Sequence, residues 1–212
     1  MRRTGTMFVA FVTGEELRPG VWDPFLYREN GKSRTLGDNM AVSRLESETM
    51  TEAPFAPLEY KHIPKENSLT FMLESSEARV NRAMNAVGEQ ALLFGTMRAY
   101  LGNVVVMPKA KWLGLASPLI YPVKADFVHL VPKDGLHYFW WAYLRSPAFL
   151  HSLPVGSGGT RPRLHPEALI RTPVSVPPIT VRRQVHLKLL SSAERAWKER
   201  TRIESLLRSV WD

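Results

Sequence analysis

The stretch ALLFGTMRAYLGNVVVM, Ala91–Met107, is the part of the chain that decides the fold. Two of its segments, Ala91–Phe94 and Asn103–Met107, are apolar runs rich in residues that favour strands. Gly95 and Gly102 lie between these runs, and glycines in this position indicate a turn region. The stretch therefore predicts two strands separated by a turn.

Around this centre, strand-like and helix-like patterns are mixed along the chain. Leu136–Leu144 contains four consecutive aromatic residues, Tyr138–Trp141, which we interpret as the core of a buried helix rather than a stacking platform. Glu74–Val87 has apolar residues at helical spacing, whereas Met40–Arg44 is expected to be irregular. The other expected elements are strands at Met7–Val12, Glu59–His62, Leu69–Leu73, Pro118–Val123, Phe127–Val131 and Val174–Val176 and helices at Ser146–Leu153 and His165–Ile170. This mixture predicts an α+β fold with a twisted mixed or antiparallel sheet.

Residues 180–210 contain neither Pro nor Gly, and their apolar residues recur mostly at steps of three and four. At 1.5 Å per residue this pattern predicts a helix roughly 45 Å long, too long to be covered by the domain before it. An exposed apolar stripe of that length favours a partner helix, so we expect a coiled coil and self-association. The residues expected in this dimerisation stripe are Val185, Leu189, Ala193, Ile203, Leu206 and Val210.

Charge is distributed unevenly along the 212 residues, whose net charge is +8. Residues 1–89 carry 11 basic and 13 acidic side chains, whereas residues 90–212 carry 17 basic and 7 acidic ones, a net of +10. A basic excess in one region can contact phosphates and attract a polyanion, although a merely basic surface has the same composition.

The sequence lacks the residues that several classes of chemistry require. Without cysteine, the chain has no disulfide, no cysteine nucleophile and no cysteine-containing zinc site, which fits a reducing, cytoplasmic location. No apolar run approaches the roughly 20 residues that cross a bilayer, so no membrane association is expected. The six histidines show no zincin spacing, and neither a glycine-rich loop for a methyl donor nor a serine-hydrolase motif is present. We therefore expect no catalytic residues, no metal and no resident cofactor.

Several motifs then occur in an informative order. They are Thr35–Asp38, Ala91–Val104, Phe127–Leu144 followed by Ser146-Pro147, Gly156–Leu164, Val174–Ile179, Gln184 and the long helix. This order resembles the target recognition domain of the DNA specificity (S) subunit of type I restriction–modification enzymes, over residues 35–210. No single motif is specific, but their combination is.

The resemblance implies a globular recognition domain at residues 1–178, with an upstream extension of unknown role at 1–34, and a spacer or dimerisation helix at 179–212. Each motif occurs once here, whereas a full S subunit resembles two such units in tandem, so the chain is expected to act as a half-subunit. Its expected partners are double-stranded DNA, of which it recognises half of a bipartite site, a DNA adenine methyltransferase (M) subunit and, beside it, a restriction (R) subunit. S-adenosylmethionine is expected on the M subunit.

Two other interpretations remain open: a stand-alone DNA-binding or inhibitory module without an enzyme partner, and an enzyme in its own right. The absent catalytic motifs argue against the enzyme.

The expected DNA-contacting residues are cations in predicted loops. Arg161 and Arg163 follow a Gly-Ser-Gly-Gly turn that lets backbone approach DNA, and Lys109 and Lys111 follow a strand. Arg98 is placed here by the resemblance. The structural alternative is that these cations are solvated or paired internally. The acidic, irregular segment 40–57 is a second possible surface, because acidic and amide side chains also read bases.

Overall fold

The computed structural model describes residues 34–43, 45–50, 54–65, 69–76, 82–154, 156–158 and 160–211. The strand expected at Met7–Val12 lies outside these residues.

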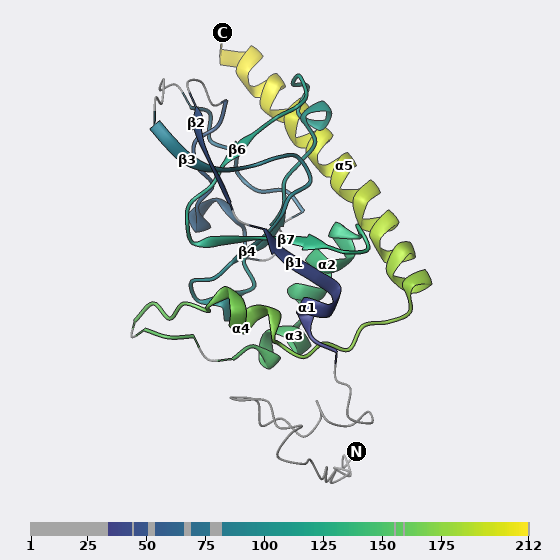
Figure 1. The fold of residues 1–212 in the computed structure, drawn as a ribbon. Coiled ribbons are helices and arrows are strands. Elements are labelled where there is room, and N and C mark those ends of the chain that lie inside the picture. Colours follow the sequence, from purple (N-terminus) through teal and green to yellow (C-terminus); the bar gives the residue numbers. More distant parts are fainter. Residues whose placement is uncertain are drawn as a thin grey trace, which may run out of the picture.

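Two antiparallel sheets form the β part of the fold (Figure 1). The first has the order β1 (Met40–Ser43), β7 (Phe127–Pro132), β4 (Leu92–Gly95) and β5 (Val104–Val106). The second has the order β2 (Glu46–Met50), β3 (Arg82–Val87) and β6 (Tyr121–Pro122). The expected α+β class and the four expected strands between residues 91 and 131 are therefore confirmed.

Strand β4 lies at the centre of the first sheet. Leu92 faces Leu130 of β7 on one side and Val106 of β5 on the other. Leu92, Leu93 and Phe94 are all 0% exposed, so the strand is covered on both faces as well as paired on both edges. An apolar run without alternation is typical of a strand in this position.

The helices cover one side of this sheet and one end of the domain. They are α1 (Leu36–Asn39), α2 (His137–Leu144), α3 (Pro147–Ser152), α4 (Pro166–Ile170) and α5 (Ile179–Trp211), with short 3₁₀ turns η2 (Tyr60–His62), η3 (Ala99–Leu101) and η4 (Ala110–Trp112). Tyr138, Phe139 and Trp140 of α2 are buried, which confirms the core interpretation of the aromatic run. Pro147 begins α3 and Pro166 begins α4, the position where a missing N–H costs least.

Three expected strands do not form: residues 60–62 make the 3₁₀ turn η2, and neither Leu69–Leu73 nor Val174–Val176 is a strand. Two further expectations about the first part of the chain are wrong. The described residues of the helix expected within Glu74–Val87 are not helical, and residues 82–87 form β3, which pairs with both β2 and β6. Met40–Ser43 is not irregular but forms β1 against β7. In both cases the partner strand lies far away in the sequence, so local spacing gave the wrong answer.

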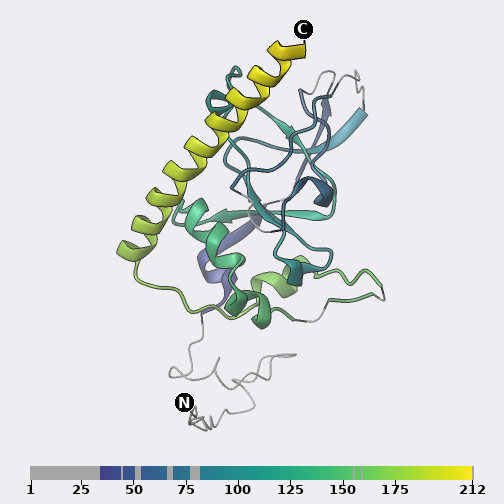
Figure 2. The same cartoon turned by 180° about the vertical axis from the view of Figure 1, so that it is seen from behind.

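Helix α5 packs along the domain for most of its length and lies against α2 (Figures 1 and 2). Ala193 is 0% exposed and Trp197 is 1% exposed, with the Trp197 ring edge-on to Phe71 at 5.2 Å between ring centroids. Val185 and Leu189 are partly buried against the same core. The long helix is confirmed, but the expectation that its apolar stripe lacks a mate within the chain is wrong for these residues.

A buried ion pair fixes the start of α5. Arg182 contacts Asp134 from the loop before α2, and these side chains are 14% and 15% exposed. The other oxygen of Asp134 accepts hydrogen bonds from Trp140 Nε1 and Leu136 N, both at 3.0 Å. His186 Nδ1 accepts a hydrogen bond from Tyr138 N at 3.3 Å, and burial lowers the pKa of His186, which favours the neutral ring that this bond needs.

The final turns of α5 are the most exposed part of the helix. Every residue from 202 to 210 is exposed. Four of them are large and apolar: Ile203, Leu206, Leu207 and Val210, with exposed fractions of 48%, 57%, 56% and 74%. One helix thus serves first as core and then as a free apolar surface.

Truncating a large apolar side chain should destabilise the protein strongly on the buried part of α5 and hardly at all on the exposed part. We expect Trp197→Ala to lower the free energy of unfolding by about 3–5 kcal/mol, because it leaves a cavity beside Phe71. Leu206→Ala, on the exposed part, should change it by less than about 0.5 kcal/mol in dilute protein. Urea denaturation of both variants measures the difference, and equal losses would contradict this account of the helix.

Candidate nucleic-acid interface

A closed hairpin carries two of the predicted DNA-contacting arginines. Ser157 N donates to Arg163 O at 2.9 Å, and Arg163 N donates back to Ser157 O at 2.8 Å. A Cβ on Gly156 would lie 2.9 Å from Arg163 O and 3.0 Å from its carbonyl carbon, so a side chain there would push into backbone. The glycine therefore permits the close approach of the two arms of this hairpin, which we call the arginine hairpin (residues 156–163).

Backbone hydrogen bonds tie the arginine hairpin to the chain that leaves β4. Leu164 N donates to Thr96 O at 3.0 Å, and Arg98 N donates to Pro162 O at 2.8 Å. Arg98 itself has a φ of 50°, in the left-handed region that non-glycine residues rarely adopt. The turn after β4 and the hairpin therefore form one structural unit.

Three of the five predicted cations meet in this unit. Arg98 Nη2 donates to Thr160 O at 3.3 Å, and Arg163 Nη2 lies 2.8 Å from Asp126 Oδ1. The Arg163 side chain remains 64% exposed despite this ion pair. Arg161 is exposed and makes no hydrogen bond or ion pair with the residues that the structure describes. The unit can thus offer guanidinium groups to a phosphate or a base edge.

Asp126 is the centre of a hydrogen-bond network next to the arginine hairpin. Its carbonyl oxygen accepts hydrogen bonds from Tyr60 Oη at 2.8 Å, Thr96 Oγ1 at 2.8 Å and Thr96 N at 2.9 Å. Tyr60 Oη in turn accepts from Met97 N at 3.1 Å. Burial raises the pKa of Tyr60 to about 12, and the charge of Asp126 acts in the same direction, so the hydroxyl stays protonated and keeps donating.

The two lysines predicted alongside these arginines lie elsewhere. Lys109 precedes η4 and Lys111 lies in it, and η4 packs against α5, on the opposite side of the molecule from the arginine hairpin (Figures 1 and 2). Lys109 Nζ lies 5.8 Å from the Trp112 ring centroid. A hydrogen bond from Lys198 lowers the pKa of Glu194 on α5, and the charges of Lys111 and Lys109 lower it further. The five predicted residues therefore do not form one continuous surface.

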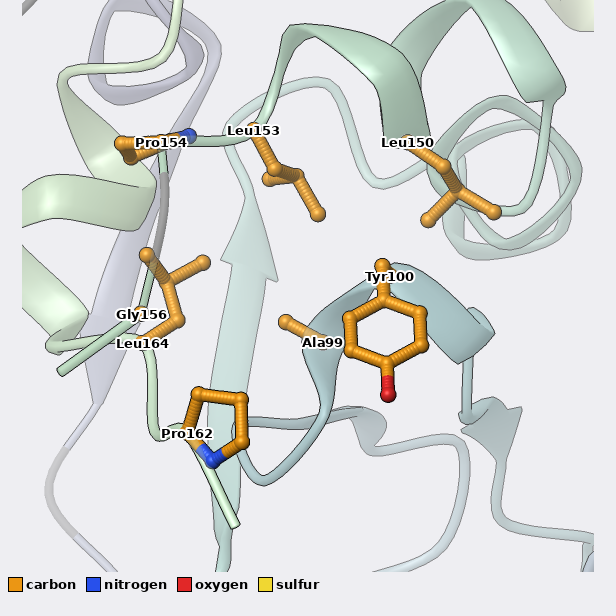
Figure 3. Close-up of a pocket in the computed structure, with 8 residues that line it drawn as sticks. All are labelled: Ala99, Tyr100, Leu150, Leu153, Pro154, Gly156, Pro162 and Leu164. Carbon is orange, nitrogen blue, oxygen red and sulfur yellow. The ribbon is translucent and has the colours of Figure 1, made fainter. Parts of the chain in front are cut away.

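A small pocket lies between η3, α3 and the arginine hairpin (Figure 3). Its volume is about 230 Å³, and its lining is mainly apolar. The lining residues are Ala99, Tyr100, Leu150, Leu153, Pro154, Gly156, Pro162 and Leu164. Tyr100 is 58% exposed, so its ring belongs to the open surface as much as to the pocket.

No sequence pattern indicated that Asp126 and Tyr60 belong to this site. Lys124 is exposed and pairs with Glu59 at 3.4 Å, close in the chain to Asp126. Asp126 is distant from the hairpin in the sequence and meets it through the ion pair with Arg163, and Tyr60 is linked to it through Asp126 O. Within the described residues, no group of three side chains that could hold a metal ion occurs, and no helix is long and apolar enough to span a bilayer.

The close approach at Gly156 predicts a specific effect of adding a methyl group. We expect Gly156→Ala to loosen the hairpin and to raise the hydrogen-exchange rates of the Ser157 and Arg163 amides at least about tenfold. Gly88→Ala is the matched control, since nothing lies within 4 Å of its Cβ position. Unchanged exchange in Gly156→Ala would show that the hairpin tolerates the side chain.

Several solved structures are similar to this chain, among them two from type I restriction–modification systems. No family model matches the chain, and no curated protein matches it. A solved structure described by "complex assembly and conformational transition of the type I R-M system" matches with 15% identity and a TM-score of 0.46, covering 84% of this chain and 42% of that chain. The HsdS subunit from Thermoanaerobacter tengcongensis matches with 14% identity and a TM-score of 0.41, covering 82% and 43%. The neighbours thus belong to type I restriction–modification systems, and the chain spans about four-tenths of their length.

Proposed function

We propose that this chain is a DNA-binding specificity subunit of a type I-like restriction–modification system. It recognises one half of a bipartite site and docks a methyltransferase subunit, which holds S-adenosylmethionine and methylates adenine. A restriction subunit joins the same assembly. The chain itself positions these enzymes and performs no chemistry.

The observation that carries the proposal is the grouping of Arg98, Arg161 and Arg163 on one rigid unit. Backbone hydrogen bonds fix Arg98 and Arg163, so little ordering of these two residues is needed when DNA binds. Arg161 is exposed, and Arg163 is 64% exposed despite its ion pair. The basic excess of residues 90–212 supplies the long-range attraction that a polyanion requires. The motif order that resembles the specificity-subunit family indicates which DNA-binding system this is.

Alanine substitution separates phosphate contacts from base contacts at these arginines. A phosphate-contacting arginine should weaken binding to all duplexes alike and reduce the log–log salt slope by about one when it is removed. A base-reading arginine should lose discrimination by about 1–3 kcal/mol. We expect Arg161→Ala and Arg163→Ala to show one of these patterns in fluorescence anisotropy, with a duplex selected from a random pool and a scrambled duplex.

The matched control is Arg183→Ala, which removes an exposed cation from α5, on the far side from the arginine hairpin. It should leave affinity and slope nearly unchanged. If Arg161→Ala and Arg163→Ala fold and bind like the parent chain, the arginine hairpin is not the DNA surface. Lys109 and Lys111 beside α5 are then the next positions to test.

We also propose that two copies associate through the free end of α5. A regular alternation of three- and four-residue steps runs along one flank of the helix: Val185, Leu189, Ser192, Ala196, Glu199, Ile203, Leu206 and Val210. This is the spacing of a coiled-coil seam. Because the first members are partly buried against the domain, the seam available to a partner lies mainly in the last turns. A two-fold pair would bring two recognition domains together on a symmetric, interrupted site.

The exposed seam can be tested without damaging the core. We expect Leu206→Glu together with Val210→Glu to shift the chain towards monomer in sedimentation experiments, because both side chains are exposed. Leu187→Glu is the matched control, as Leu187 is 62% exposed on the same helix but lies off the seam. Leu189 is unsuitable, since it packs against its own domain. A parent chain that is monomeric at micromolar concentration, alone and with its partners, would refute self-association.

A further inference from the structure

The 3₁₀ turn η3 presents two large apolar side chains to solvent. Tyr100 is 58% exposed and Leu101 is 53% exposed, next to each other in the connection from β4 to β5. Ala99, the first residue of the turn, is 8% exposed and anchors it to the core. Within the described part of the chain, this turn joins exposed apolar groups directly to the arginine hairpin.

The turn is rigid rather than a loose loop. Leu101 N donates to Arg98 O at 2.9 Å, and Gly102 N donates to Ala99 O at 3.0 Å. Left-handed residues close it at both ends, Arg98 with a φ of 50° and Gly102 with a φ of 65°. A Cβ on Gly102 would lie 3.0 Å from Leu150, so α3 packs tightly beneath the turn. The left-handed conformation is strained for a non-glycine residue such as Arg98, so surrounding contacts must hold the residue in it.

Cations border the exposed pair from more than one direction. Arg98 begins the turn and binds Thr160 O of the hairpin that carries Arg161 and Arg163. From the α2–α3 junction, Arg145 Nη1 donates to Gly102 O at 3.3 Å and Nη2 donates to the backbone oxygen of Lys65 at 3.4 Å. Apolar groups between cations complement a DNA groove, where base edges lie between two rows of phosphates.

We propose that Tyr100 and Leu101 form an apolar wedge that enters the minor groove of bound DNA and partly unstacks one base step, while the flanking arginines hold the phosphates on either side. This inference rests on the proposed DNA-binding function. It adds that part of the binding free energy is apolar, and that the protein distorts the duplex at a fixed distance from the arginine hairpin. The rigidity of η3 suits this role, because a wedge must keep its shape against stacked bases.

The experiment combines affinity, salt dependence and local base stacking. The probe is the selected duplex with 2-aminopurine placed at successive positions, whose fluorescence rises where a base unstacks. We expect Tyr100→Ala and Leu101→Ala each to weaken binding about tenfold or more, to leave the salt slope unchanged and to abolish the fluorescence rise. Tyr100→Phe should keep both the affinity and the fluorescence rise, since the proposed contact with the bases is made by the aromatic ring and not by the hydroxyl. Leu187→Ala, at an exposed apolar site on α5, is the matched control.

The arginine variants distinguish failure of this inference from failure of the proposed function. If Arg161→Ala and Arg163→Ala weaken binding while Tyr100→Ala and Leu101→Ala, shown to be folded, bind and unstack like the parent, the wedge is refuted and the DNA surface stands. If no variant of either set changes DNA binding, both are refuted. If Tyr100→Ala leaves DNA binding intact but lowers association with a methyltransferase subunit, the turn is a protein-docking surface, which also overturns the wedge.

Discussion

Strand β4 imposes the constraint on which the rest of the structure depends. A strand covered on both faces has no access to water, so its backbone N–H and C=O groups must be paired within the protein. Strands β5 and β7 pair its two edges, and the chain beyond it continues the same hydrogen bonding at Thr96 and Arg98. The carbonyl groups of Asp126 and Pro162 accept from those residues. Burial of β4 thus fixes Arg98, which follows it, and the hydrogen bonds of Thr96 and Arg98 attach the arginine hairpin to this buried strand.

Helix α5 has two different environments along its length: its first part packs against the domain and its last turns are exposed. The ion pair of Arg182 with Asp134 and the burial of Trp197 hold the helix to the domain. Removing one partner of such a buried pair leaves an uncompensated charge, so the pair fixes position even where it adds little net stability. Beyond residue 201 every described residue of the same helix up to 210 is exposed, and its apolar side chains face solvent. Attachment to the domain therefore gives the free end a defined direction.

Local electrostatics explain why predicted cations differ in what they can contact. Lys109 and Lys111 lie near Glu194, which forms an ion pair with Lys198 at 2.7 Å. Arg163 is held by Asp126 yet keeps most of its side chain exposed, and Arg161 has no described partner. A carboxylate that pairs with one guanidinium nitrogen orients the guanidinium group without covering it. Counting positive charges along the chain cannot separate these cases, because the carboxylates come from distant segments.

The sequence by itself determined the elements whose signals are local. The apolar runs after residue 90, the aromatic helix α2 and the proline-free helix α5 are each specified by their own residues. Tertiary structure alone decided the strands β1 and β3, because they exist through pairing with distant partners. It also decided that Ala193 is core while Leu206 is free, and that Arg98 meets the arginine hairpin while Lys109 does not. The physical reason is the same throughout: hydrogen bonding, burial and charge compensation between distant segments depend on where the chain returns, and periodicity within a segment does not contain that information.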